Sequence, residues 1–148
     1  MQKRVGLAVF AVLAVSALMM GGIWLRQHKQ NYAGTVEDRW GIVLPEERRT
    51  VYTKEDITGD HGEGTEYHVL QYGEKDNVEK AADWNLGNPP EAAITILAQT
   101  DVPAAKQPDL SGEWKWFTAG KASSAYYDRV YLFWDETVRQ VYVLESFD

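Results

Sequence analysis

The sequence predicts an α+β fold, in which an N-terminal transmembrane helix precedes one small domain with an antiparallel sheet of about five strands and two short helices. Three observations lead to this prediction. The chain begins with a long uncharged apolar run, several later segments alternate between apolar and polar residues, and helix-capping patterns stand between those segments. A chain of 148 residues has room for one such domain.

Residues 5–25 form the apolar run. It is 21 residues long and carries no charge, which is enough for a helix to cross the ~30 Å hydrocarbon core of a bilayer. Basic residues flank it on both sides, so residues 1–30 are predicted to be a membrane anchor with basic flanks. A cleaved signal peptide is the alternative, but its apolar region usually spans only ~7–15 residues.

This anchor also predicts a partner and a location. Residues 5–25 would lie in the lipid bilayer, and the chain would be a single-pass protein of the cell membrane. Lys3 and Arg4 on one side balance Arg26 and Lys29 on the other, so flanking charge does not decide the orientation. A very short N-terminal tail before a long domain favours an extracytoplasmic C-terminal domain.

The rest of the chain is acidic. Residues 31–148 contain all 22 acidic residues but only 11 of the 15 basic ones, which gives a net charge of −11. Such a surface repels phosphate, so we expect no nucleic acid partner. A protein partner, in particular a basic one, is compatible with this charge.

Residues 31–47 are predicted to be a juxtamembrane segment, within which residues 31–40 fit either a short helix or a linker. The acidic α+β domain then covers residues 48–148. Its first two strands are predicted at 48–55 and 65–72, joined by a long glycine-rich connection. Alternation in the second strand places four side chains on one face: Glu66, His68, Leu70 and Tyr72.

Two short helices are expected to follow, both packed on one side of the sheet. Asp76 can cap the first helix and Gly87 can end it. Asn88 can cap the second helix, because Pro89 suits the first helical position.

The C-terminal third contains the most apolar strands. Residues 113–120 alternate, and residues 129–147 read as a hairpin whose turn is Asp135–Thr137. Both arms of the hairpin are apolar or aromatic at nearly every position, which places them at the centre of the sheet.

The loop "TGDHGEGT" with the following "EYH" is the densest group of potential metal ligands. Asp60, His61, Glu63 and His68 are the candidate ligands, but their spacing matches neither a helical histidine pair nor an EF-hand. We therefore expect a glycine-permitted hairpin turn, with no metal ion and no cofactor.

No catalytic motif stands out. The chain has no cysteine, no Gly-x-Ser-x-Gly and no glycine-rich phosphate-binding fingerprint, so a non-enzymatic role is predicted. Aromatic side chains at strand spacing usually belong to a core, but some can form a binding surface. The candidates for that surface are Trp114, Trp116, Tyr126 and Tyr127.

Three stretches carry a resemblance to a known group of proteins: "WGIVLP", "DHGEGTEYHVLQY" and "YLFWDETVRQVYVLES". Their order resembles that of a family of uncharacterised small single-pass membrane proteins of Gram-positive bacteria. That family carries a His-Gly-Asp/Glu-Gly turn, which is here His61 to Gly64, with Glu63 at the acidic position. The layout is also similar to that of membrane-tethered immunity proteins, which implies a binding or protective role.

The sequence thus predicts a membrane-anchored extracytoplasmic protein that is non-enzymatic and has a binding or immunity-like function. The alternative hypothesis is a metal-binding or sensory extracytoplasmic domain that uses the Gly-Asp-His-Gly-Glu-Gly loop.

Overall fold

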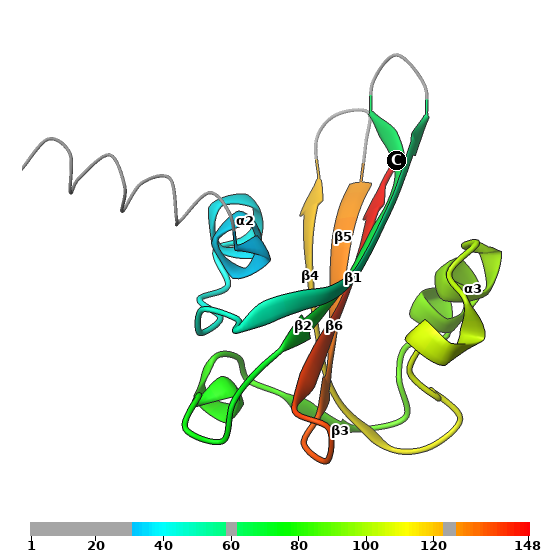
Figure 1. Ribbon diagram of the computed structural model, residues 1–148. Helices are drawn as coiled ribbons and strands as arrows, with labels where there is room; N and C mark the ends of the chain where they lie inside the picture. Colours follow the sequence, from blue (N-terminus) through cyan, green and yellow to red (C-terminus); the bar gives the residue numbers. More distant parts are fainter. Residues whose placement is uncertain (1–30, 59–61, 123–126) are drawn as a thin grey trace, which may run out of the picture. The chain divides into compact units, whose positions relative to one another are not determined.

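An antiparallel sheet of six strands carries the fold (Figure 1). The computed structural model describes residues 31–58, 62–122 and 127–148. Along the chain the strands are β1 (Arg49–Thr58), β2 (Glu63–Gln71), β3 (Asn85–Gly87), β4 (Trp114–Ala122), β5 (Tyr127–Asp135) and β6 (Gln140–Phe147). Their order across the sheet is β1-β2-β6-β5-β4-β3.

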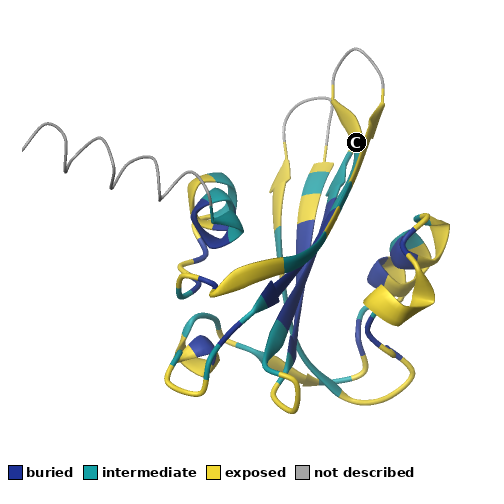
Figure 2. Cartoon of the chain, viewed as in Figure 1, coloured by how far each residue is buried: buried dark blue, intermediate teal, exposed yellow. Residues whose placement is uncertain are grey.

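The centre of the sheet holds the most apolar strands, as the sequence predicts. In β5 and β6, Leu132 lies opposite Val143 and Phe133 lies opposite Tyr142. Branched and aromatic side chains favour strands because they pack well on a pleated surface. Figure 2 shows that burial is deepest along the middle of these strands.

The connection between β1 and β2 is shorter than predicted. The strands continue to Thr58 and restart at Glu63, and these two residues face each other in the register. Gly64 allows this close pairing, because a Cβ there would meet the Asp56 carbonyl oxygen at 2.1 Å. Its φ of 143° also lies in a region that side chains rarely adopt.

Two α-helices cover opposite faces of the sheet (Figure 1): α2 (Tyr32–Trp40) and α3 (Glu91–Gln99). Helix α2 packs Ala33 and Val36 against one face, and α3 packs Ala93 and Leu97 against the other. The prediction that both helices lie on one side is therefore wrong. The continuous apolar runs of β5 and β6 explain the difference, because they make both faces of the central strands apolar and each face has to be covered.

Helix α2 is held at its start by a distant carboxylate. The backbone N–H groups of Tyr32 and Ala33 both donate to the buried Glu47, the second at 3.1 Å. A negative group at this end of a helix satisfies free donors and complements the helix dipole. Residues Ile42 and Leu44 follow the helix into the same core.

The first predicted helix is wrong, because only a short 3-10 turn forms at Val78–Lys80. Asp76 does not cap it, since its carboxylate accepts a hydrogen bond from the Gly73 backbone N–H at 2.6 Å. The chain then forms β3, a strand of three residues that the sequence did not predict. The second predicted helix is confirmed as α3, which begins after Pro90 rather than after Asn88.

The predicted fold class is corrected in a further respect. The transmembrane helix predicted for residues 5–25 lies outside the described residues. In the described part of the chain, no helix is long and apolar enough to cross a membrane. The fold of that part is therefore a six-stranded sheet with one helix on each face and no single-pass membrane element.

Candidate functional site

Of the four predicted metal ligands, the structure describes only Glu63 and His68, and these two lie apart. Asp60 and His61 lie outside the described residues. Glu63 is exposed at the start of β2, whereas His68 is buried five residues further along that strand, a separation of about 17 Å. An odd separation on a strand also places the two side chains on opposite faces.

Of the predicted aromatic residues, Trp114 and Trp116 share one face of β4 and pack against the same core, whereas Tyr127 pairs with the opposite end of that strand. Tyr126 lies outside the described residues, and Tyr127 is exposed at the first position of β5. Trp116 is half-buried and packs against the core on the α3 face. Trp114 lines a hollow at the other end of the sheet, beside β3.

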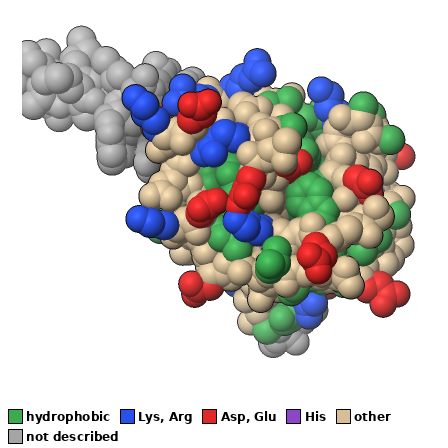
Figure 3. Space-filling view, turned by 90° about the horizontal axis from the view of Figure 1, so that it is seen from below, with side chains coloured by type: hydrophobic (Ala, Val, Ile, Leu, Met, Phe, Trp, Pro, Cys, Tyr) green, Lys and Arg blue, Asp and Glu red, His purple; other side chains and the backbone are tan. Residues whose placement is uncertain are grey.

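That hollow adjoins a second one, and together they form what we call the Leu86 surface. The two hollows have volumes of about 460 and about 510 Å³ and share Leu86 and Lys115. Leu86 is 75% exposed, the highest value among the large apolar residues of the described chain. Three tryptophans also line the surface: Trp84, Trp114 and Trp134. Figure 3 views this end of the domain and shows apolar side chains exposed beside acidic ones.

The Leu86 surface is strongly acidic. Among the described residues that line it, Lys115 is the single basic one, and its ammonium group contacts Glu136 and lies 3.5 Å from Glu79. Six acidic residues line the same surface: Glu79, Asp83, Asp109, Glu113, Asp135 and Glu136. The combination of indole rings and excess carboxylates suits a positively charged ligand.

Backbone hydrogen bonds fix parts of this surface. The Trp114 indole N–H donates to the Asp109 carbonyl oxygen at 2.7 Å, and the Trp84 indole N–H donates to the Val78 carbonyl oxygen at 3.1 Å. Asp135 accepts the Thr137 backbone N–H at 2.8 Å and thereby shapes the turn between β5 and β6. The rings and the turn are therefore positioned before any ligand arrives.

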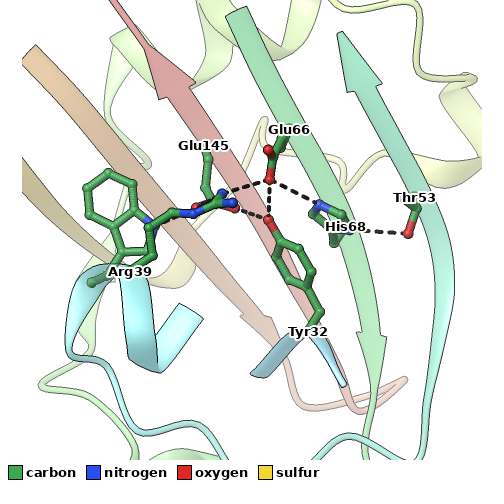
Figure 4. Close-up of polar contacts among 7 residues, drawn as sticks. Tyr32, Arg39, Thr53, Glu66, His68 and Glu145 are labelled. Atoms are coloured by element: carbon green, nitrogen blue, oxygen red, sulfur yellow. Dashed lines mark hydrogen bonds and ion pairs between the residues drawn. The ribbon is translucent and has the colours of Figure 1, made fainter. Parts of the chain in front are cut away.

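A second group of polar residues lies under α2, and we call it the α2 polar cluster (Figure 4). Its members come from α2, β1, β2 and the distant β6: Tyr32, Arg39, Trp40, Thr53, Glu66, His68 and Glu145. Glu145 is fully buried in β6, and Glu66 is nearly buried in β2. The cluster thus places two carboxylates inside the domain.

Donors from α2 meet these carboxylates. The Arg39 Nη1 atom donates to Glu66 at 2.7 Å and to Glu145 at 2.9 Å. The Trp40 indole N–H also donates to Glu145. The Tyr32 hydroxyl lies between the two carboxylates, 2.7 Å from Glu66 and in contact with Glu145. Because it has one proton, it can donate fully to one carboxylate at a time.

These contacts change the pKa values of the groups involved. The nearby His68 ring lowers the pKa of Glu66 most, and hydrogen bonds from Arg39 and Tyr32 also lower it, so that it falls to about 2 although burial opposes the change. Burial raises the pKa of Tyr32, and the charge of Glu145 raises it further. Burial lowers the pKa of Arg39, but its hydrogen bond to Glu66 and the charge of Glu145 outweigh that effect, so the pKa rises.

His68 is the least satisfied member of the cluster. Its side chain is 2% exposed, and its Nδ1 atom lies 3.1 Å from the Thr53 hydroxyl oxygen. Its Nε2 atom has no hydrogen-bond partner among the described residues and lies 3.8 Å from a Glu66 oxygen. The Tyr32 ring stacks on the imidazole with their centroids 3.3 Å apart.

Sequence reasoning found part of this cluster. Alternation along β2 correctly places Glu66 and His68 on the same face as apolar residues, which is a signal for buried polar groups. Glu145 interrupts the apolar run of β6, and that interruption is a second signal. The contacts of these carboxylates with Tyr32 and Arg39 could not be predicted from the local sequence, because they depend on where α2 packs on the sheet.

Comparisons with known proteins add no assignment to either group of residues. No protein-family model, no characterised protein and no solved structure matches this chain.

Proposed function

We propose that the domain is a non-enzymatic binding module that captures a basic segment of a protein partner at the Leu86 surface. The observation that carries this proposal is the composition of the two hollows, in which six carboxylates face one lysine around exposed Leu86 and three indoles.

Electrostatics supports a cationic ligand. The net negative charge of residues 31–148 attracts a basic partner from a distance. The excess carboxylates of the Leu86 surface make that surface the place where such a partner would bind. The ammonium group of Lys115 already binds at this surface in the way expected of a ligand cation, because it contacts Glu136 and approaches Glu79.

The apolar members supply a second contribution. Leu86 and the half-buried faces of Trp84 and Trp114 can bury the aliphatic stems of lysine or arginine side chains. An indole face also attracts a cation above it. A basic segment in an extended conformation would therefore gain from both kinds of contact at one site.

A fluorescence titration tests this proposal. The full-length chain is titrated with a lysine- and arginine-rich peptide and with a glutamate-rich peptide of equal length, and tryptophan emission is recorded at low and at physiological salt. We expect saturable binding of the basic peptide alone, weakened by salt. Replacing Glu113 and Glu136 by glutamine should weaken it about tenfold.

The control has the same change of net charge at a distant place. Glu37→Gln with Glu46→Gln alters two exposed residues near α2 and should leave the affinity almost unchanged. Equal weakening by both pairs of substitutions would mean that only the overall charge matters, and would contradict a specific site.

Two other sequence hypotheses stay predictions. The extracytoplasmic location depends on residues 1–30, which lie outside the described residues, and the protective role rests on a resemblance that nothing here tests. The metal-binding loop likewise stays a prediction, because Asp60 and His61 lie outside the described residues.

A further inference from the structure

The α2 polar cluster holds a buried nitrogen that the fold leaves without a partner. His68 Nε2 is the atom in question, and it faces the Glu66 carboxylate in Figure 4. A distance of 3.8 Å is too long for a hydrogen bond. Buried polar atoms are nearly always paired, so an unpaired one that points into a group of carboxylates calls for an explanation.

The charges of the cluster also favour an additional cation. Donors from α2 surround both carboxylates, as they do around ionised groups: Arg39 donates to Glu66 and to Glu145, and the Trp40 indole N–H donates to Glu145. Arg39 is the basic side chain that reaches both carboxylates. It brings one positive charge against two negative ones, so the buried carboxylate pair is only half neutralised.

The ligand atoms are also close enough to share an ion. Suitable atoms of Glu66, His68 and Glu145 all lie within 4.8 Å of one another, and no other such group of three occurs in the described part of the chain. Metal bonds of ~2.0–2.2 Å to nitrogen and oxygen hold neighbouring ligands ~3–4 Å apart. Side-chain movement that withdraws the Tyr32 hydroxyl from between the two carboxylates would therefore close the group around one ion.

The surroundings of His68 suit a metal ligand. A ligating histidine usually donates its second ring N–H to a fixed oxygen, which sets the tautomer. Here Nδ1 lies 3.1 Å from the Thr53 hydroxyl. With the proton on Nδ1 the Nε2 lone pair is free for an ion, whereas with the proton on Nε2 the ring faces Glu66 as a donor. The stacked Tyr32 ring holds the imidazole plane in place.

We propose that Glu66, His68 and Glu145 form a binding site for a first-row divalent metal ion, and that Arg39 competes with the ion for the two carboxylates. Imidazole and carboxylate ligands without thiolates suit Zn²⁺ and its neighbours in that row. A divalent ion neutralises both carboxylates, whereas Arg39 neutralises one. Arg39 can leave because it lies at the rim, with its side chain 35% exposed.

Competition with Arg39 gives the proposal its sharpest test. The affinity of the EDTA-treated full-length chain for Zn²⁺ is measured by competition with a chromophoric chelator, and Co²⁺ is added to record the visible absorption of the site. We expect one ion per chain. Arg39→Ala should bind Zn²⁺ at least about tenfold more tightly, because it removes a positive charge next to the ion.

Substitutions of His68, Thr53 and His61 test whether the ion binds in the cluster or in the loop. His68→Gln should weaken Zn²⁺ binding at least about tenfold and remove the Co²⁺ bands, and Thr53→Val should weaken binding about tenfold. His61→Gln is the matched control for the loop and should change neither property. Circular dichroism establishes that each variant is folded.

Three results would overturn the site. A folded Arg39→Ala variant that binds no Zn²⁺ would show that Arg39 is a structural counter-ion only. Zinc binding lost in His61→Gln but kept in His68→Gln would move the ion to the loop. Weaker zinc binding in Arg39→Ala would exclude competition. The Arg39 substitution is at the rim, so it stays informative if His68→Gln fails to fold.

Discussion

The α2 polar cluster and the Leu86 surface use the same kinds of side chain in opposite ways. Both combine carboxylates, indoles and one basic residue. In the cluster, α2 covers the carboxylates of Glu66 and Glu145 and supplies donors to them. At the Leu86 surface, five of the six acidic residues are exposed, and Lys115 lies between two of them. Burial therefore decides which carboxylates are held by hydrogen bonds within the fold and which remain open to a peptide from solvent.

The largest expected effect comes from removing the buried carboxylate. Glu145→Ala leaves the donors of Tyr32, Arg39 and Trp40 without their shared acceptor, and one of them is charged. We expect a loss of about 3–5 kcal/mol in the free energy of unfolding. Urea denaturation measures it. Glu136→Ala is the matched substitution on the Leu86 surface and should change stability by less than about 0.5 kcal/mol.

A smaller loss is expected from a single hydroxyl group. Tyr32→Phe keeps the ring stacked on His68 but removes the donor that lies between Glu66 and Glu145. The expected cost is about 1–3 kcal/mol, measured by thermal unfolding. Tyr127→Phe makes the same chemical change at an exposed position and should be nearly neutral. Equal effects at both positions would mean that burial does not separate the two regions.

The dependence of stability on pH should also originate in the cluster. The pKa of Glu66 is about 2 in the folded protein and 4.5 as its ordinary value. Its ionised form therefore stabilises the fold above about pH 4.5, and this contribution disappears as the pH falls toward 2. Unfolding of wild type and Glu66→Gln across this range measures it. The stability difference between them should shrink with falling pH, and a constant difference would contradict the assignment.

The smallest effect on stability is expected at Lys115. Its ion pairs are solvent-exposed, so Lys115→Ala should change the free energy of unfolding by about 0–1 kcal/mol. The same substitution frees Glu136 and Glu79 for a ligand and should strengthen binding of the basic peptide. Thermal unfolding and the fluorescence titration measure the two quantities on one sample. Weaker peptide binding in this variant would argue against Lys115 as a placeholder for a ligand cation.

The sequence predicts the strands more accurately than the helices and short segments that pack on the sheet. Strong alternation and the apolar hairpin locate β1, β2, β4, β5 and β6 within a few residues, because the pattern depends on local geometry. The short β3 carries no such pattern, since three residues cannot show a period. The capping pair at Asp76 misled the prediction, because its carboxylate binds the Gly73 N–H instead.

The candidate sites were less predictable for a different reason. Glu66 and Glu145 are adjacent in the register of β2 and β6, although they are 79 positions apart in the chain. Only the strand order brings them together, and only the docking of α2 adds Tyr32 and Arg39. The Leu86 surface likewise forms where β3 meets the turn between β5 and β6, and neither segment shows it alone.

Nuclear magnetic resonance of the tryptophan indole N–H groups tests the contrast between the two regions most directly. The chain has six tryptophans, of which Trp40 reports on the cluster while Trp84 and Trp114 report on the Leu86 surface. We predict that the basic peptide shifts the Trp84 and Trp114 signals and leaves that of Trp40 in place. A peptide that shifts Trp40 and leaves Trp84 and Trp114 unchanged would contradict the assignment of binding to the Leu86 surface.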